Sequence, residues 1–167
     1  MVIDAEQKAW EQEILQKSDP LDRYDRKIIK LLCTDGRLPV TELARRVGLS
    51  KSPCQVRLKR LRDEGYITGF RAMIDPKKLH LEHVAFVEVK LSDTSEKALS
   101  AFNAAVRELG EVEQCHMIAG AFDYLLKIRT TDIRAYRAVL GEKVSTLPFV
   151  ANTSTHVSME AVKDTLG

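Results

Sequence analysis

The stretch VTELARRVGLSKSPCQVRLKRLRDEG, residues 40–65, decides the fold of the first half of this chain. Its two helix-forming parts are separated by a short break that contains Gly48, Ser50, Ser52 and Pro53. Glycine is typical of the end of a helix, and serine followed by proline is typical of a helix start. We therefore predict two helices joined by a tight turn.

The second of these helices has two chemically different faces. At 100° per residue, Cys54, Leu58 and Leu61 fall on one side and are expected to face a core. The opposite side carries Ser52, Val56 and Lys59, flanked by Gln55 and Arg60. A solvated helix face has no use for an outward valine. A helix that is apolar inward, and basic, amide and hydroxyl outward, suits insertion into the major groove of DNA.

Positive charge is concentrated around this helix. The chain has 167 residues and a net charge of +2, but residues 37–71 hold nine basic residues against three acidic ones. This segment therefore has a net charge of +6 and leaves −4 for the rest of the chain. Such a segment is a candidate binder of a polyanion, here double-stranded DNA, with an affinity that falls as salt rises.

The donor, acceptor and methyl groups of bases in the major groove suggest a contact for each outward side chain. Gln55 can pair with adenine, and Lys59 or Arg60 with guanine. Ser52 can pair with either base, and Val56 can touch a thymine methyl group. These five residues are the candidates for sequence recognition.

Other residues are better placed for the DNA backbone. Ser50 and Lys51 lie at the start of the helix, where phosphates bind readily, and Arg37 and Arg45 are further candidates. Arg57 lies near the edge of the apolar face. Two alternatives stay open for Arg57: a contact with DNA, or an ion pair with an acid inside the domain.

The other elements follow from periodicity and punctuation. An N-terminal extension, residues 1–20, precedes a helix from near Asp22 to Gly36, and Pro39 suits the first turn of the next helix. The helix of the opening stretch runs to about Glu64 and stops at Gly65. Residues 66–75, YITGFRAMID, are rich in β-forming side chains and predict a short strand or hairpin, which makes the domain a winged type.

The second half has a different pattern. Strands are predicted at 84–91, in VEQCHMIAG (112–120), in YLLKIRT (124–130) and in the segment from 149 to 162, with helices over 95–109 and 133–147. The order is βαββαβ, so we expect a ferredoxin-like split βαβ sandwich. The fold class is α+β, with boundaries at 1–20 for the extension, 21–82 for the helix-turn-helix domain and linker, and 83–167 for the sandwich.

Composition argues against several classes of protein. No window approaches the ~18 apolar residues of a membrane span, and the N-terminus lacks the pattern of a secretory signal, so we expect a cytoplasmic protein. The three cysteines include no CxxC, and the four histidines are dispersed, so neither a metal site nor a cofactor is expected.

These motifs closely resemble the Lrp/AsnC family of bacterial transcription regulators. The similarity covers residues 21–163 and rests on LDRYDRKI, VGLSKSPC, GAFDYLL and the closing LPFV, in that order. Some features are similar to the branch of the family that controls proline dehydrogenase. The resemblance implies a helix-turn-helix at about residues 40–59 and a ligand-sensing C-terminal domain.

The resemblance also implies partners and an effector site. Family members dimerise through the C-terminal domain and often assemble into octamers. Their effectors are amino acids, here proline or leucine, bound around a turn that corresponds to Gly120, Ala121, Phe122, Asp123 and Tyr124. Asp123 could take a ligand ammonium group, or it could only fix a hairpin. Ala121 and His156 depart from the common pattern, and we include both in the expected effector site.

Two further functions compete with an effector-linked regulator. An enzyme is disfavoured because the sequence shows no nucleophile with a base at a recognisable spacing, no phosphate loop and no metal cluster. A chromosome-organising protein of low sequence preference would share the same helix-turn-helix. A small ratio of specific to random DNA affinity would favour it.

Overall fold

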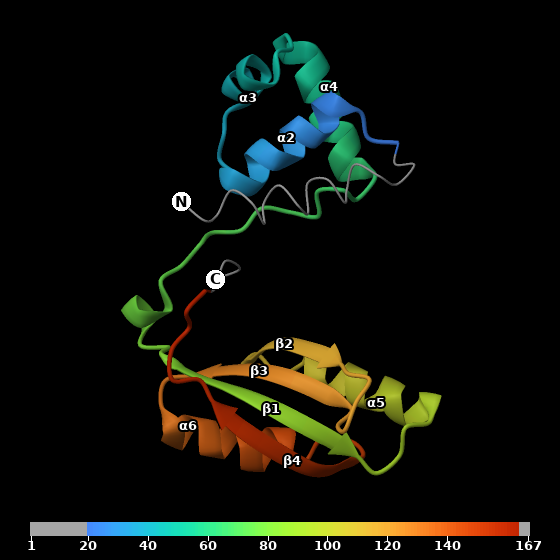
Figure 1. The fold of residues 1–167 in the computed structure, drawn as a ribbon, viewed down its shortest axis with the longest axis vertical. Coiled ribbons are helices and arrows are strands. Elements are labelled where there is room, and N and C mark those ends of the chain that lie inside the picture. Colours follow the sequence, from blue (N-terminus) through green and yellow to red (C-terminus); the bar gives the residue numbers. More distant parts are fainter. Residues whose placement is uncertain (1–19, 164–167) are drawn as a thin grey trace. The chain divides into compact units, whose positions relative to one another are not determined.

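The computed structural model describes residues 20–163 of the chain (Figure 1). The predicted extension at residues 1–20 lies almost entirely outside these described residues. The contacts divide the chain into two compact units, one ending at Ala72 and the other beginning at Met73. In the described part, no helix is both long enough and apolar enough to cross a membrane.

The described part of the first unit contains three helices that begin and end close to the predicted residues. Helix α2 spans Arg23–Thr34, α3 spans Val40–Val47 and α4 spans Lys51–Asp63 (Figure 1). Gly48 ends α3 with a φ of 88°, a left-handed conformation that glycine adopts without steric cost. Because three residues separate α3 from α4, the predicted helix-turn-helix is confirmed.

A small apolar core holds these helices together. Its fully buried side chains include Ile28 of α2, Leu43 of α3, and Cys54 and Leu61 of α4. Leu58 is partly buried against the same cluster, as its position on the inward face of α4 predicts. Burial of these side chains on one face of each helix leaves the opposite face of α4 exposed to solvent.

The strand or hairpin predicted for residues 66–75 is wrong for this chain, because the structure has no strand there. Ile67 instead donates its backbone N–H to Leu61 O at 3.0 Å and packs on the helical core. Phe70 lies close to Gly36, where an added Cβ would come within 3.0 Å of its ring. A β-forming segment needs a neighbouring strand to complete its hydrogen bonds, and here only Ile67 is partly buried against the helices while residues 68–75 are exposed.

The second unit is the predicted α+β sandwich. A short 3₁₀ helix, η1 (Pro76–Leu79), leads into strands β1 (His83–Leu91), β2 (Val112–Met117), β3 (Tyr124–Thr130) and β4 (Val150–Val157). Helix α5 (Glu96–Arg107) joins β1 to β2, and α6 (Ile133–Ala138) follows β3 (Figure 1). The sheet order is β2-β3-β1-β4, and all three neighbouring pairs are antiparallel.

The alternation along the strands separates the two faces of this sheet. Val87, Leu126 and their same-face neighbours pack against Phe102 of α5 and Tyr136 of α6. The other face carries Glu88, together with Phe86, Lys90, Lys127, Arg129 and His156. The helices therefore cover one face of the sheet, and polar and charged side chains dominate the other.

Three predicted elements of this unit are shorter than expected, and one of them is β2, which ends at Met117 instead of Gly120. The helix predicted over 133–147 is α-helical only to Ala138 and continues as a π-helical turn, η2 (Val139–Val144), in which Ser145 N–H reaches Leu140 O at 2.8 Å. Gly141 lies inside this turn, where its low helix propensity weakens the regular helix. Strand β4 ends at Val157 instead of continuing to residue 162.

Candidate nucleic-acid interface and ligand-binding turn

Helix α4 presents an exposed face that begins directly after the turn at Gly48. Val56 is 69% exposed, a large value for an apolar side chain with a helical core on the far side of the same helix. Ser52 and Gln55 are also exposed on this part of α4. A hollow of about 540 Å³ lies beside Val56 and is lined by Asp22, Ser52, Pro53, Val56, Arg57 and Arg60.

The basic residues at the edges of this surface differ in how firmly they are held. Lys51 is exposed, and Lys59 pairs with Asp63 one helical turn further on. Lys59 is 76% and Asp63 58% exposed. Exposed pairs of this kind contribute about 0.3–0.5 kcal/mol, so a phosphate or a base can replace the carboxylate at little cost. Arg45 pairs with Glu42 within α3 in a similar way.

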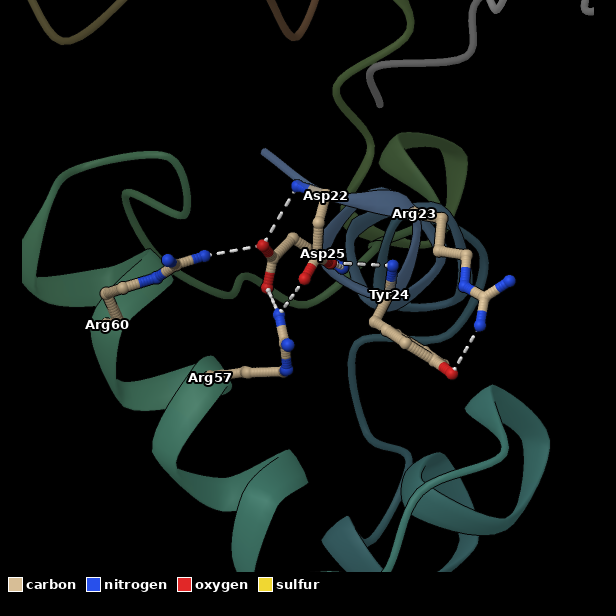
Figure 2. A network of polar contacts seen from close by, with 6 residues as sticks. All are labelled: Asp22, Arg23, Tyr24, Asp25, Arg57 and Arg60. Carbon is tan, nitrogen blue, oxygen red and sulfur yellow. Dashed lines mark hydrogen bonds and ion pairs between the residues drawn. The ribbon is translucent and has the colours of Figure 1, made fainter. Parts of the chain in front are cut away.

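Arg57 and Arg60 line the same hollow, but their guanidinium groups are held by ion pairs, and the two side chains are 28% and 40% exposed. Both guanidinium groups point towards the start of α2 and hydrogen-bond to the carboxylate of Asp25 (Figure 2). Arg57 Nη1 lies 2.9 Å from Asp25 Oδ1, and Arg60 Nη2 lies 2.5 Å from Oδ2. For Arg57 the structure shows the ion-pair alternative. Arg60, expected to flank the outward face, is also paired with Asp25, and its side chain stays 40% exposed.

Asp22 completes this network from the N-cap of α2. Its Oδ1 accepts hydrogen bonds from the backbone N–H groups of Tyr24 at 2.8 Å and Asp25 at 3.0 Å. Its Oδ2 lies 2.6 Å from Arg57 Nη1. The Asp25 N–H bond, followed by the Arg57 contact, lowers the Asp22 pKa to about 2. In return, Asp25 and Asp22 raise the pKa of Arg57, whose guanidinium lies 5.4 Å from the centre of the Tyr24 ring.

The turn between β2 and β3 contains the predicted effector residues. Asp123 Oδ2 accepts the backbone N–H of Leu91 at 2.8 Å, and Oδ1 accepts Lys90 Nζ at 3.1 Å. The Leu91 bond is the main reason that the Asp123 pKa is lowered. The Asp123 N–H also reaches Val89 O at 2.9 Å. The side chain of Asp123 therefore joins the end of β1 to this turn, as the hairpin alternative expects.

The other residues of the turn divide into a buried and an exposed group. Tyr124 is 1% exposed and packs on Phe102 with ring centroids 4.4 Å apart. Burial raises the pKa of Tyr124. Gly120 and Ala121 are exposed. A hollow of about 430 Å³ lies beside Tyr124, between α5 and β2.

Within one chain, His156 lies apart from this turn. His156 of β4 lies opposite Phe86 of the neighbouring strand β1, on the open face of the sheet, and its Nε2 lies 3.2 Å from Glu88 Oε1. Tyr124 pairs with Val89 on the helix-covered face. One small amino acid cannot contact both side chains through the sheet of a single chain.

Sequence reasoning missed the pair of aspartates that engage the arginines. The spacing of Asp22 and Asp25 is the signature of a capping box, and the structure contains one: Asp22 N–H reaches Asp25 Oδ2 at 3.1 Å. This signal predicts the start of α2. It does not predict that Asp25 also binds α4, because Arg57 and Arg60 are 32 and 35 residues away in the chain.

These features define the class of the protein. A helix-turn-helix with an exposed second helix, in a chain that also carries a βαββαβ domain, is the architecture of a DNA-binding transcription regulator with a separate ligand-binding domain. Two family models match the chain: a winged helix-turn-helix DNA-binding model over residues 21–68 and the Lrp/AsnC ligand-binding domain over residues 84–167. The chain belongs to the Lrp/AsnC family.

Individual relatives agree with this assignment. The chain is 66% identical to a proline dehydrogenase transcriptional activator of Rhizobium radiobacter, over 89% of this chain and 96% of the relative. It is 46% identical to the leucine-responsive regulatory protein of Salmonella typhimurium, over 86% and 87%. A transcriptional regulator of Neisseria meningitidis, solved in complex with L-methionine, superimposes with a TM-score of 0.81 at 34% identity, over 87% of this chain and 94% of that one. These proteins are transcription regulators and not enzymes.

Proposed function

We propose that this protein is a sequence-specific regulator of transcription whose binding to DNA changes when an amino acid binds its C-terminal domain. The observation that carries the first part is the exposure of Val56 in the middle of the outward face of α4. An apolar side chain there has no partner within the helical core, and a thymine methyl group in the major groove supplies one.

The contacts that we propose follow the exposed side chains of α4. Ser52, Gln55, Val56 and Lys59 face base edges, and Ser50 and Lys51 hold phosphates at the start of the helix. We leave Arg57 and Arg60 out of the contact set because their guanidinium groups are held by Asp25.

For the effector, we propose a small amino acid bound at the turn of residues 120–124. The relative solved with L-methionine and the leucine-responsive relative support this class of ligand. Gly120 and Ala121 are exposed, and backbone N–H groups at such a turn suit a ligand carboxylate. Asp123, already bonded to Leu91 and Lys90, shapes this turn. His156 can join such a site only from another chain.

We also propose that the protein forms homodimers through its C-terminal domain, that dimers assemble further into octamers, and that it acts in the cytoplasm, where bacterial DNA lies. The open face of the sheet supports the dimer, because Phe86 lies there beside charged side chains and no helix of the described residues packs on it. Light scattering of the purified protein, with and without amino acids, tests the assembly.

The test of the function is binding to the DNA upstream of the protein's own coding region, at fixed salt, with a panel that includes proline, leucine and methionine. We expect a complex that is at least about a thousandfold tighter than with random DNA and that one amino acid strengthens or weakens. Equal binding to random DNA, with no response to any amino acid, would instead favour a chromosome-organising protein of low sequence preference.

A further inference from the structure

The carboxylate of Asp25 is the most completely enclosed charged group of the described helical unit. Its side chain is 1% exposed, and each oxygen accepts a bond from a different arginine of α4. Oδ2 also accepts the backbone N–H of Asp22, which fixes the carboxylate at the start of α2. Figure 2 shows both arginines reaching across from α4 to this one group.

This arrangement determines how α4 is rotated about its axis. Apolar packing is not directional, so a small core by itself leaves a helix some freedom to roll. Arg57 and Arg60 lie three residues apart and therefore on one side of α4, close to the direction of α2. Two charge-assisted hydrogen bonds to a single fixed carboxylate restrict this rotation, and with it the direction in which Gln55 and Val56 point.

The same contacts change the charge that α4 offers to DNA. Asp22 and Asp25 match the charges of Arg57 and Arg60, so this group of four is neutral overall. The positive charge left on the exposed part of α4 comes from Lys51, Lys59 and Arg62, of which Lys59 pairs with Asp63. Fewer cations are then available for the phosphates, whose contacts do not distinguish one sequence from another.

We propose, building on the DNA-binding function above, that Asp25 is a positioning residue for sequence recognition. It holds Arg57 and Arg60 away from the phosphates and fixes the rotation of α4 that directs Gln55 and Val56 to base edges. Asp25 itself does not touch DNA.

The first test measures the salt dependence of DNA binding for the arginine variants. Each phosphate contact contributes about 0.9 to the slope of log K against log salt concentration. We expect Arg57→Gln and Arg60→Gln to leave this slope unchanged and to lower the preference for the specific site. Lys51→Gln should instead reduce the magnitude of the slope by about 0.9, because it removes one phosphate contact. A slope lowered by about 0.9 in either arginine variant would show a direct phosphate contact and overturn the proposal.

The second test compares Asp25→Asn with Glu42→Gln. Both substitutions remove one carboxylate that holds two arginines, but Glu42 pairs with Arg45 and Arg46 inside α3 and does not reach α4. We expect Asp25→Asn to steepen the salt slope as guanidinium groups are released, and to lower the ratio of specific to random DNA affinity about tenfold, the discrimination of roughly one base contact. Glu42→Gln should leave this ratio unchanged.

Circular dichroism and thermal melting establish that each variant is folded at the temperature of the binding measurement. If Asp25→Asn lowers the melting temperature but keeps the salt slope and the specificity ratio of the wild type, Asp25 is only structural and the proposal is wrong. If Asp25→Asn does not fold, the two arginine variants decide. Failure of the wild type to bind any DNA would instead overturn the proposed function, which is a different result.

Discussion

Replacing Val56 with alanine separates a role in recognition from a role in folding. The substitution removes two methyl groups, which contribute up to about 1.6 kcal/mol when they are fully buried. Because Val56 is 69% exposed, folding buries only about a third of this surface, so the loss of stability should be about 0.5 kcal/mol. If a thymine methyl group covers the side chain in the complex, Val56→Ala should also lose the remaining burial energy of about 1.1 kcal/mol from binding, which raises Kd about sixfold.

The assay for this prediction is a cycle that pairs the protein change with a DNA change. Deoxyuridine lacks the methyl group of thymine, so one thymine of the operator at a time is replaced by deoxyuridine and Kd is measured with wild type and Val56→Ala. At the contacted thymine, the effects of the two changes on the free energy of binding should not add, because each change removes the same contact. Leu61→Ala is the matched control: Leu61 is fully buried, so truncation should cost about 2–5 kcal/mol of folding stability.

Two results would refute this reasoning. Additive effects at every thymine would show that Val56 touches no methyl group. An equal loss of affinity for specific and random DNA, or a loss of stability comparable to that of Leu61→Ala, would show that Val56 acts through the fold.

Three further predictions concern stability. The Asp22 pKa is about 2 in the folded state and 3.8 without its partners, so the stabilisation that Asp22 gives is complete above about pH 4 and is lost as pH falls towards 2. Because Asp22 is 46% exposed, this stabilisation is at most about 1 kcal/mol, and Asp22→Asn should remove it in urea titrations between pH 2 and 5. Gly48→Ala should lower the free energy of unfolding by about 1–2 kcal/mol because φ is 88° at this residue. Gly110→Ala is the control without this strain, and equal melting temperatures of the two variants would contradict the prediction. Asp123→Ala should cost about 1–3 kcal/mol because the Leu91 N–H loses its acceptor, and thermal melting with unchanged stability would show that this bond is dispensable.

Recognition of the fold from sequence succeeded where the signal is local. Helices α2, α3 and α4 begin and end within about two residues of expectation, because caps, glycines and a 3.6-residue period act over one or two turns. The order βαββαβ was equally readable from alternation and turn residues. The outward direction of Val56 followed from the same periodicity.

Contacts between residues distant in sequence account for the differences between the predicted and the observed structure. Residues 66–75 have the composition of a strand, but no strand lies beside them in the described chain, and only Ile67 packs against the helical core. His156 and Tyr124 both belong to the predicted effector site, yet the register of the sheet places them on opposite faces. Neither result depends on local propensity, and the pairing partners are distant in sequence.

What the sequence by itself determined is therefore the set of elements, their inward and outward faces and the family. What only the tertiary structure decided is which charged groups meet. Arg57 and Arg60 have the composition and position of DNA contacts, but the buried carboxylate of Asp25, more than thirty residues earlier, takes both. Periodicity assigns a side chain to a face of its helix, whereas its partner depends on how two helices pack, and that is a property of the folded chain.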